Sequence, residues 1–287
     1  MGEGAKFFFK SLFQNKAAFL GLVIIIFVFA LALGADFIAP YDASYQDRES
    51  FLLPPSWEEG GSSKYLLGTD PIGRDLLSRI IHGSRYSIFI GVSVVSLSLI
   101  IGIIGGVIAG YFGGMIDFVI MRLMDILLAF PSLLLALVIA SILGPGLVNA
   151  AIAITVVQLP HFIRLTRAEV MQHKTKEYYT ATKVIGASKI RLMFITLLPN
   201  CFSPLIVQGT LNFSNAILDA AALGFLGLGA QPPTPEWGTM LADAREFVLS
   251  AWWVVTFPGL AILITVMAIN VFGDGLRDIL DPKLRKS

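Results

Sequence analysis

The chain has 287 residues, of which 55% are hydrophobic and only 14% are charged, and its formal net charge is +1. Soluble domains carry about 25% charged residues. This deficit, together with a mean hydropathy of +0.76, excludes an ordinary soluble domain and places the chain among membrane proteins. A net charge near zero provides no broad field to attract a nucleic acid. The single cysteine, Cys201, excludes an intrachain disulfide.

An apolar run over residues 17–33 follows three lysines near the N-terminus. The run is longer than the apolar region of a typical signal peptide, and residues 36–40 contain no cleavage site built from small residues. We therefore interpret it as a retained signal anchor, and a cleaved signal is the alternative. It is the first predicted membrane span.

Six segments have the roughly 20 mostly apolar residues that a membrane span requires. Their apolar residues run continuously and do not alternate with polar ones, which excludes a β-barrel and leaves helices that satisfy their own backbone hydrogen bonds. The sequence therefore predicts an all-α polytopic membrane protein. The predicted spans are 17–35, 86–110, 117–143, 146–166, 203–228 and 251–273.

The distribution of basic residues predicts the orientation. If the N-terminus lies inside, then segments 1–16, 164–202 and 274–287 and the short turn at Arg122 lie inside as well, and together they hold 15 of the 21 Lys and Arg residues. Inside loops of membrane proteins are enriched in these residues. Both termini are therefore expected in the cytoplasm.

The external loop 36–85 ends in a predicted amphipathic helix. Asp70 is a suitable N-cap with Pro71 at the first helical position, and apolar residues then recur at helical spacing as far as Ile81. Such a helix would lie at the outer membrane interface. Its simplest role is to anchor the next span.

Small residues form a ladder at the end of the second span, at Gly102, Gly106, Gly110 and Gly114. A spacing of four puts these glycines on one helix face, where another helix backbone can approach closely. The partner is either a helix of this chain or a helix of a second subunit.

Segment 164–202 carries seven basic residues against two glutamates and is the longest inside loop. Residues 177–185 predict a helix that Gly186 ends in the left-handed conformation that glycine favours. Residues 187–197 predict a second helix, broken by Leu198-Pro199, with Ile190, Met193, Phe194 and Leu197 on one side. A pair of short helices has too little surface to fold alone. We therefore expect a partner to cover its apolar side.

Recognisable catalytic patterns are missing from the sequence. It has no phosphate-binding loop, no metal-ligand spacing among its three histidines, and no nucleophile elbow. Local hydrogen bonding is the simplest role for His161. Asp219 lies inside a predicted span, where an ionisable group usually faces a cavity or a partner. It could line a solute path near a peptide amino group, or pair with Asn212, Asn215 or another chain.

The inside segment resembles the coupling motif of ATP-binding-cassette importer permeases, which reads Glu-Ala-Ala, three residues, Gly, nine residues, Ile-x-Leu-Pro. Gly186 takes the place of the glycine, and the Leu-Pro pair follows at the matching spacing. Ala181 fits an alanine position, whereas Thr182 replaces the second alanine and Glu177 lies a few residues early.

Three further stretches look like the dipeptide/oligopeptide permease C-subunit family. Residues 68–75 resemble the stretch before its second span, residues 223–238 its fifth span and outer loop, and residues 257–282 its last span and tail. The resemblance covers essentially the whole chain in order. It implies a type I importer permease fold, with residues 1–85 preceding a five-helix core of residues 86–287.

The resemblance also implies the partners. The chain would form a heterodimer with a homologous permease subunit in the lipid bilayer. Two ATPase subunits would bind ATP and Mg inside, so this chain would need no cofactor of its own. An extracellular or periplasmic solute-binding protein would deliver cargo outside. The expected ATPase contacts are Glu177, Tyr178, Ala181, Thr182, Gly186, Ala187, Ile190, Leu198 and Pro199.

The outer loop after the fifth span is rich in proline. It would either touch the binding protein or simply connect two spans. The candidate contact residues are Gln231, Pro232, Pro233, Glu236 and Trp237.

The expected function is that of a non-catalytic subunit of a peptide importer in the cell membrane. The same importer class also carries nickel, glutathione or oligosaccharides, and these substrates stay open. A stand-alone secondary transporter or channel is disfavoured because no internal repeat is visible, and a membrane enzyme because no catalytic constellation is.

Overall fold

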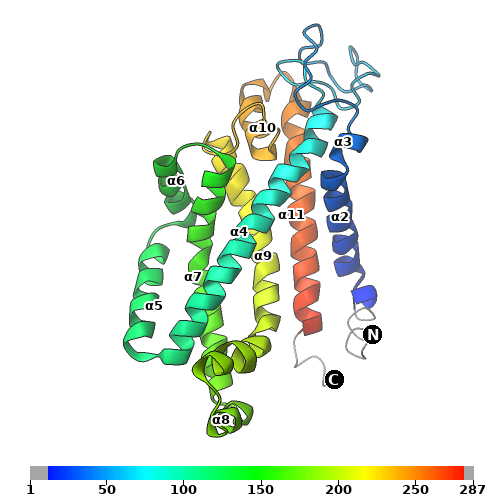
Figure 1. The fold of residues 1–287 in the computed structure, drawn as a ribbon. Coiled ribbons are helices and arrows are strands. Elements are labelled where there is room, and N and C mark those ends of the chain that lie inside the picture. Colours follow the sequence, from blue (N-terminus) through cyan, green and yellow to red (C-terminus); the bar gives the residue numbers. More distant parts are fainter. Residues whose placement is uncertain (1–11, 281–287) are drawn as a thin grey trace.

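The computed structural model describes residues 12–280, and its regular structure over that range is entirely helical (Figure 1). Five helices in this range are long and apolar enough to cross a membrane. They are α2 (Lys16–Leu33), α4 (Leu76–Phe112), α7 (Leu147–Lys174), α9 (Leu198–Phe225) and α11 (Trp252–Leu280). The predicted all-α polytopic fold is therefore confirmed.

Shorter helices join and cover the long ones. They are α3 (Ala35–Ile38), α5 (Gly114–Leu128), α6 (Ser132–Leu143), α8 (Glu177–Val184), the π-helix η1 (Arg191–Leu197), α10 (Trp237–Ala244) and the 3₁₀-helix η2 (Arg245–Phe247). The segment 39–75 forms a loop layer at the same end of the bundle as α10, and α8 projects from the opposite end (Figure 1). We refer to these as the α10 end and the α8 end.

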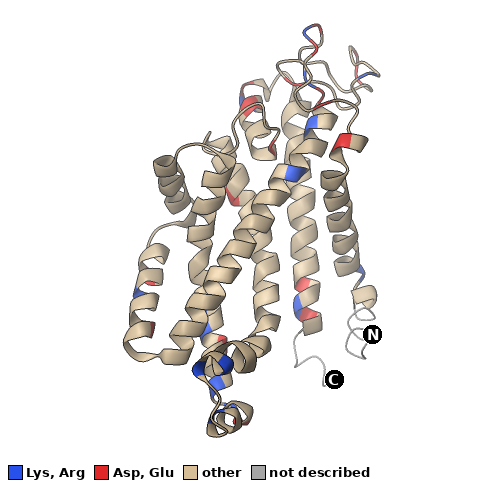
Figure 2. Cartoon of the chain, viewed as in Figure 1, with Lys and Arg blue, Asp and Glu red and all other residues tan. Residues whose placement is uncertain are grey.

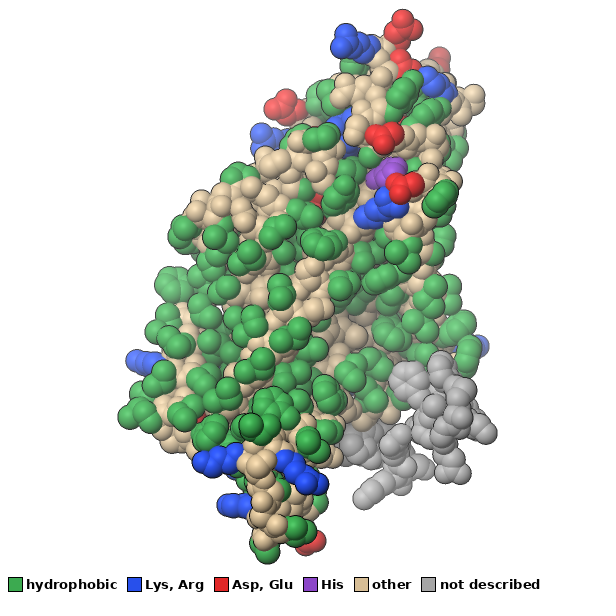
Figure 3. All heavy atoms as spheres, viewed as in Figure 1, with side chains coloured by type: hydrophobic (Ala, Val, Ile, Leu, Met, Phe, Trp, Pro, Cys, Tyr) green, Lys and Arg blue, Asp and Glu red, His purple; other side chains and the backbone are tan. Residues whose placement is uncertain are grey.

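Charge follows this arrangement. Most charged residues lie near the two ends of the bundle, and the middle carries few (Figure 2). Hydrophobic side chains cover the middle of the face seen in Figure 3. A belt of this kind suits a lipid environment. Residues 12 and 280, the first and last described residues, lie at the α8 end. Residues 1–11 and 281–287 contain parts of the predicted inside segments and lie outside the described residues. The orientation of the termini stays a prediction.

The predicted third span, 117–143, is not one helix. It is divided into α5 and α6, which meet at an angle of 93° across a short break. Pro131 explains the break, because proline cannot donate a backbone hydrogen bond and disfavours the helical conformation of the residue before it. The predicted count of six spans is matched only if this bent pair is taken as one span.

The outer amphipathic helix was predicted to begin too early. Asp75 caps α4 by accepting a hydrogen bond from the Ser78 N–H at 2.8 Å, and α4 then continues without interruption into the apolar span. Asp70 instead forms an ion pair with Arg74, and Gly73 has a positive φ of 79° that stops a helix from starting earlier. The predicted separate helix capped by Asp70 is therefore wrong.

The glycine ladder packs against α7 of the same chain. A Cβ at Gly102, Gly106 or Gly110 would lie against atoms of α7, and at Gly106 it would overlap the Thr166 side chain. Gly114 departs from the ladder, because it begins α5 and a Cβ there would meet no atom within 4 Å. The first three glycines are therefore used for packing within the chain.

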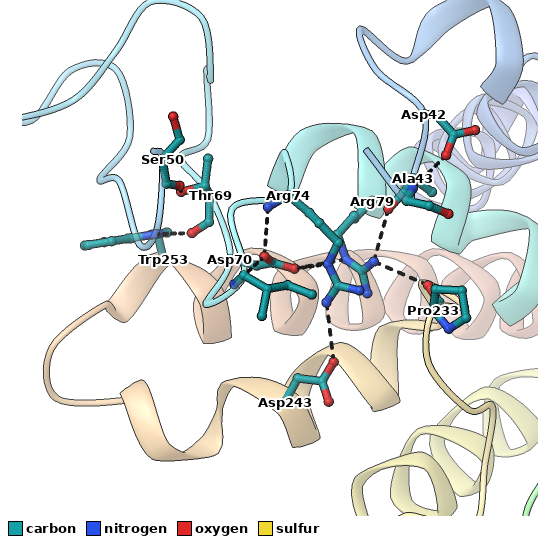
Figure 4. A network of polar contacts seen from close by, with 12 residues as sticks. Asp42, Ala43, Ser50, Thr69, Asp70, Arg74, Arg79, Pro233, Asp243 and Trp253 are labelled. Atoms are coloured by element: carbon teal, nitrogen blue, oxygen red, sulfur yellow. Dashed lines mark hydrogen bonds and ion pairs between the residues drawn. The ribbon is translucent and has the colours of Figure 1, made fainter. Parts of the chain in front are cut away.

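A buried network of charges ties the loop layer to α10 (Figure 4). Arg79 is 2% exposed, lies 3.5 Å from the Asp70 carboxylate, and donates hydrogen bonds to the Ala43 and Pro233 carbonyls. Its contacts thus join two outer segments that are far apart in sequence. Burial raises the pKa of the Asp243 carboxyl on α10. The nearby positive charges of Arg74 and Arg79 favour the carboxylate and so act to lower this pKa.

Candidate functional site

The α8 end carries the coupling segment, residues 177–197. Its first helix, α8, ends in a Schellman arrangement: the Gly186 N–H donates to the Lys183 carbonyl and the Ala187 N–H donates to the Thr182 carbonyl. Gly186 has a φ of 89°, which L-residues with side chains rarely adopt. The predicted helix and its glycine turn are confirmed as local structure.

The second predicted helix takes a different course. Helical structure resumes after Ser188, becomes π-helical in η1, and continues directly into α9. The predicted break at Leu198-Pro199 is wrong. Pro199 lies in the first turn of α9, where its missing N–H costs little, and the Leu198 N–H bonds the Met193 carbonyl across the wider π turn.

The predicted apolar side of this segment is divided between two environments. Met193 and Leu197 are buried in the bundle, in a cluster that includes Val107 of α4. The chain itself therefore covers part of the face that was expected to need a partner. The uncovered apolar side chains gather at the turn, where Val184, Ile185 and Ile190 are 81%, 86% and 70% exposed.

A shallow apolar depression accompanies these exposed residues. It has a volume of about 510 Å³ and lies on the free side of α8. The residues that line it are Thr175, Glu177, Thr180, Ala181, Val184 and Ile185. An exposed apolar patch rimmed by polar residues is typical of a protein–protein contact.

Polar contacts join α8 to the end of α7, and the end of α7 to the end of α4. The Lys174 ammonium donates hydrogen bonds to the Gly110 and Tyr111 carbonyls, at 3.0 and 2.8 Å, and so caps the end of α4. The Tyr178 hydroxyl bonds the His173 ring at 2.8 Å, and burial raises the pKa of Tyr178. The Tyr178 contact thus connects α8 to α7, and the Lys174 contact connects α7 to α4.

The second candidate site is a polar cavity between the long helices. It has a volume of about 360 Å³ and is bounded by α7, α9 and the start of α6. The structure brings the predicted residues Asn212, Asn215 and Asp219 together along it, because their spacing places them on one face of α9. The other lining residues are Ser132, Val157, Gln158, His161, Gln208 and Leu218.

Sequence reasoning missed part of this lining. Gln208 lies one helical turn before Asn212, so the polar stripe of α9 extends further than the residues selected. Gln158 and His161 are three residues apart on α7 and form the facing wall. The His161 ring forms no hydrogen bond with another residue within 12–280, so the local side-chain bonding expected for it is not seen there. Polar periodicity inside each apolar span is the signal that would have found these residues.

Hydrogen bonds fix the amide groups of the cavity. The Gln158 Nε2 donates to the Asn212 backbone carbonyl at 3.2 Å, and the Gln208 Nε2 donates to the Asn212 Oδ1 at 2.9 Å. Gln158 and Asn212 are 4% and 3% exposed, yet the Gln158 Oε1 and the Asn212 Nδ2 have no hydrogen-bond partner in the described chain. Buried polar atoms normally have partners.

The outer-loop residues are largely used within the chain. Glu236 caps α10 by accepting from the Gly238 and Thr239 N–H groups, both at 2.9 Å, and burial raises its pKa. The Trp237 indole donates to the Ile80 carbonyl and is 2% exposed. These two side chains therefore offer no outer surface.

Residues 231–233 remain exposed at the α10 end. They include Gln231, Pro232 and Pro233, and the Pro233 carbonyl accepts from the buried Arg79. An outer contact of this loop would therefore involve its first half.

Two family models match the chain. Residues 102–286 match the binding-protein-dependent transport system inner membrane component. The chain belongs to this family. Residues 6–55 match the N-terminal TM domain of oligopeptide transport permease C. The resemblance drawn from the sequence motifs is confirmed, and the chain is a multi-pass membrane component of a transport system.

Similar proteins extend along nearly the whole chain. The di/tripeptide transport system permease protein DppC of Pseudomonas aeruginosa is 59% identical over 282 residues, which cover 98% of this chain and 93% of that protein. The dipeptide transport system permease protein DppC of Escherichia coli K12 is 60% identical over 273 residues, 95% of this chain and 91% of that one. The glutathione transport system permease protein GsiD of Pectobacterium atrosepticum is 40% identical over 280 residues, which cover 98% of this chain and 91% of that protein.

Proposed function

We propose that this chain is the non-catalytic permease subunit of an ATP-driven dipeptide importer and forms half of the translocation pathway with a second permease subunit. The observation that carries the proposal is the exposed apolar turn of the coupling segment, at the place where the family motif puts an ATPase contact. The substrate is proposed from the relatives, since those that are about 60% identical are named for dipeptides and the glutathione permease is more distant.

Two ATPase subunits dock at the α8 end in this proposal. Val184, Ile185 and Ile190 enter an apolar groove on the ATPase, which removes their exposed surface from water. ATP and Mg are bound there and not by this chain. The binding protein meets the α10 end, where residues 231–233 are exposed.

The connection of the helices supports a mechanical role. The coupling segment leads through η1 into α9 without a break, and α9 carries one wall of the polar cavity. Lys174, the last residue of α7 and three residues before the coupling segment, joins the end of α7 to the end of α4. ATP-driven movement of the ATPases would shift α8, and the continuous helix would transmit this shift to α9. The cavity would then open alternately to one side of the membrane and to the other.

The test is reconstitution of the complex in proteoliposomes. We expect the chain to copurify with its ATPase subunits, and dipeptide-loaded binding protein to stimulate ATP hydrolysis and uptake. Ile185→Asp places a charge in the proposed contact and should abolish copurification. Leu249→Asp is the matched control, because Leu249 is fully exposed in the connection between η2 and α11, far along the chain from the coupling segment.

Two results would contradict the proposal. One is dipeptide flux through liposomes that contain this chain without ATPase subunits or nucleotide, as a secondary transporter or channel would show. The other is unchanged ATPase binding by the Ile185→Asp variant.

A further inference from the structure

We propose that the polar cavity between α7 and α9 is a half-site for a dipeptide in transit, in which Asp219 holds the α-ammonium group and two amide side chains hold the peptide bond. This inference rests on the proposed transport of dipeptides. It assigns a binding site and a ligand chemistry to this chain itself, in addition to the site on a separate binding protein.

The first argument is the charge of the cavity wall. Asp219 is half-buried within α9, and its carboxylate forms no ion pair or hydrogen bond with any described residue. None of the residues that line the cavity is Lys or Arg. A carboxylate at this depth is costly without a counter-charge. A ligand with an ammonium group supplies that charge, whereas water alone does not.

The second argument is the pair of unpartnered amide atoms. Gln158 must present its Nε2 to the Asn212 backbone carbonyl, because a carbonyl only accepts, and this leaves the Gln158 Oε1 free as an acceptor. The Asn212 Nδ2 is free as a donor. One acceptor and one donor match the N–H and the C=O of a peptide bond. Both side chains are more than nine-tenths buried and both residues line the cavity, so a ligand bound there is the partner that we infer for their free atoms.

The third argument is that the cavity is small, open on one side and without a cationic group that could hold the carboxylate of a dipeptide. Its volume of about 360 Å³ lies at the lower end of the range for small-molecule sites, which is about 300–1,000 Å³. No cationic side chain in its lining would hold the carboxylate of a dipeptide. His161, Asn215 and Leu218 are exposed at its rim, so the cavity is open on one side. The carboxylate end therefore points out of this chain, toward the second permease subunit, which completes the site.

The proposed half-site recognises the backbone of a dipeptide and not its side chains. The carboxylate and the two amides contact groups that every dipeptide has, and the open side leaves room for different side chains. An N-acetylated dipeptide keeps the peptide bond but loses the positive charge. It should therefore bind the cavity far more weakly than the free dipeptide.

A cysteine-protection experiment tests this in the assembled transporter. The chain has one cysteine, Cys201, which is fully buried, so its background labelling is low. Leu218→Cys places a thiol at the rim beside Asp219. In proteoliposomes whose other subunits lack accessible cysteines, Ala-Ala should slow labelling of this thiol, and N-acetyl-Ala-Ala should not. Asp219→Asn should raise the Ala-Ala concentration needed for half-protection by roughly 10- to 100-fold, the range of a lost charge-assisted hydrogen bond.

Conservative and matched variants separate binding from structure. Asp219→Glu keeps the charge and should retain most of the protection. Asp274→Asn makes the same chemical change at an exposed position of α11 outside the cavity and should leave protection unaltered. Both variants should assemble normally with the partner subunits.

The outcomes distinguish this inference from the proposed function. If the wild-type complex imports Ala-Ala with ATP but Ala-Ala gives no protection, or both ligands protect equally, the half-site is wrong and the importer stands. If Asp219→Asn disrupts assembly instead of protection, Asp219 pairs with another subunit and the half-site is again wrong. Failure of ATP-driven uptake in the wild type would contradict the proposed function itself.

Discussion

Gly106 and Gly186 both require the absence of a side chain, but for different physical reasons. At Gly106 the reason is space, because the α7 backbone and Thr166 lie where a Cβ would be. At Gly186 no atom lies within 4 Å of a Cβ, and the reason is the positive φ of 89°. A spacing of four residues between glycines predicts a glycine needed for close packing. A glycine at the end of a helix predicts one needed for positive φ. Only the fold shows which helix meets the ladder.

The packing role of Gly106 leads to a stability prediction. Gly106→Ala should destabilise the protein by about 1–3 kcal/mol, because backbone atoms of α7 cannot move aside easily. Gly105→Ala is the matched control, since its nearest neighbour is the flexible tip of Ile163 at 3.2 Å. The measurement is thermal unfolding of the purified complex in detergent. Equal stability of the two variants would show that α4 and α7 do not pack as described.

At the scale of helices, the pattern of apolar residues predicted where the helices are but not all of their limits. The capping potential of Asp70 is lost to the neighbouring arginines, and Asp75 begins α4 instead. Pro131 breaks a predicted span, whereas Pro199 is accommodated in a helix. The effect of a proline depends on whether the residues before it supply another hydrogen-bond pattern, and the π turn of η1 does so only in the second case.

The turn of the coupling segment makes a prediction for transport. Gly186→Val should reduce ATP-driven uptake at least tenfold, because a β-branched residue at positive φ is strained and would displace Ile185 and Ile190. Gly186→Asn should keep most of the uptake, since asparagine tolerates this conformation best among residues with side chains. Uptake is measured in proteoliposomes with the binding protein present. Normal transport by the valine variant would mean that the turn does not set the ATPase contact.

The buried network at the α10 end should dominate the stability of the outer layer. Arg79→Met removes the hydrogen bonds to the Ala43 and Pro233 carbonyls, while Asp70 keeps its pair with Arg74, and should cost about 1–3 kcal/mol. Lys64→Met removes the exposed partner of Asp47 and should cost at most about 1 kcal/mol. Limited proteolysis of residues 39–75 in the assembled complex reports the difference. Similar protease resistance of the two variants would contradict the assigned role of Arg79.

At the scale of the whole molecule, the two ends carry the two contacts of the proposed function. The coupling segment lies at one end and the loop layer with α10 at the other, and a mostly apolar belt separates them (Figures 1 and 2). The polar cavity lies in the span region between them, on the helix that continues from the coupling segment. This arrangement places the proposed ATPase contact, a connecting helix and the proposed solute site along one continuous stretch of chain.

The predicted orientation can be tested by thiol labelling. Ile185→Cys should react with a membrane-impermeant reagent in inside-out vesicles that lack the ATPase subunits, and not in intact spheroplasts, because basic loops stay inside. Ser63→Cys, which is exposed in the loop layer, should show the reverse pattern. The buried Cys201 keeps the background low. Labelling of Ile185→Cys from outside would show that the topology is the reverse of the predicted one and would contradict the proposed ATPase contact.

The sequence by itself determined the membrane class, the helical spans other than the broken third one, the glycine turn and the family, since each depends on local composition or on short-range spacing. The tertiary structure decided which residues meet across space. It brought Gln158 of α7 to Asn212 of α9, turned Met193 and Leu197 inward, and enclosed Glu236 and Trp237. Contacts between distant segments depend on how the helices pack against one another, and helical periodicity specifies the face of a helix but not its neighbour.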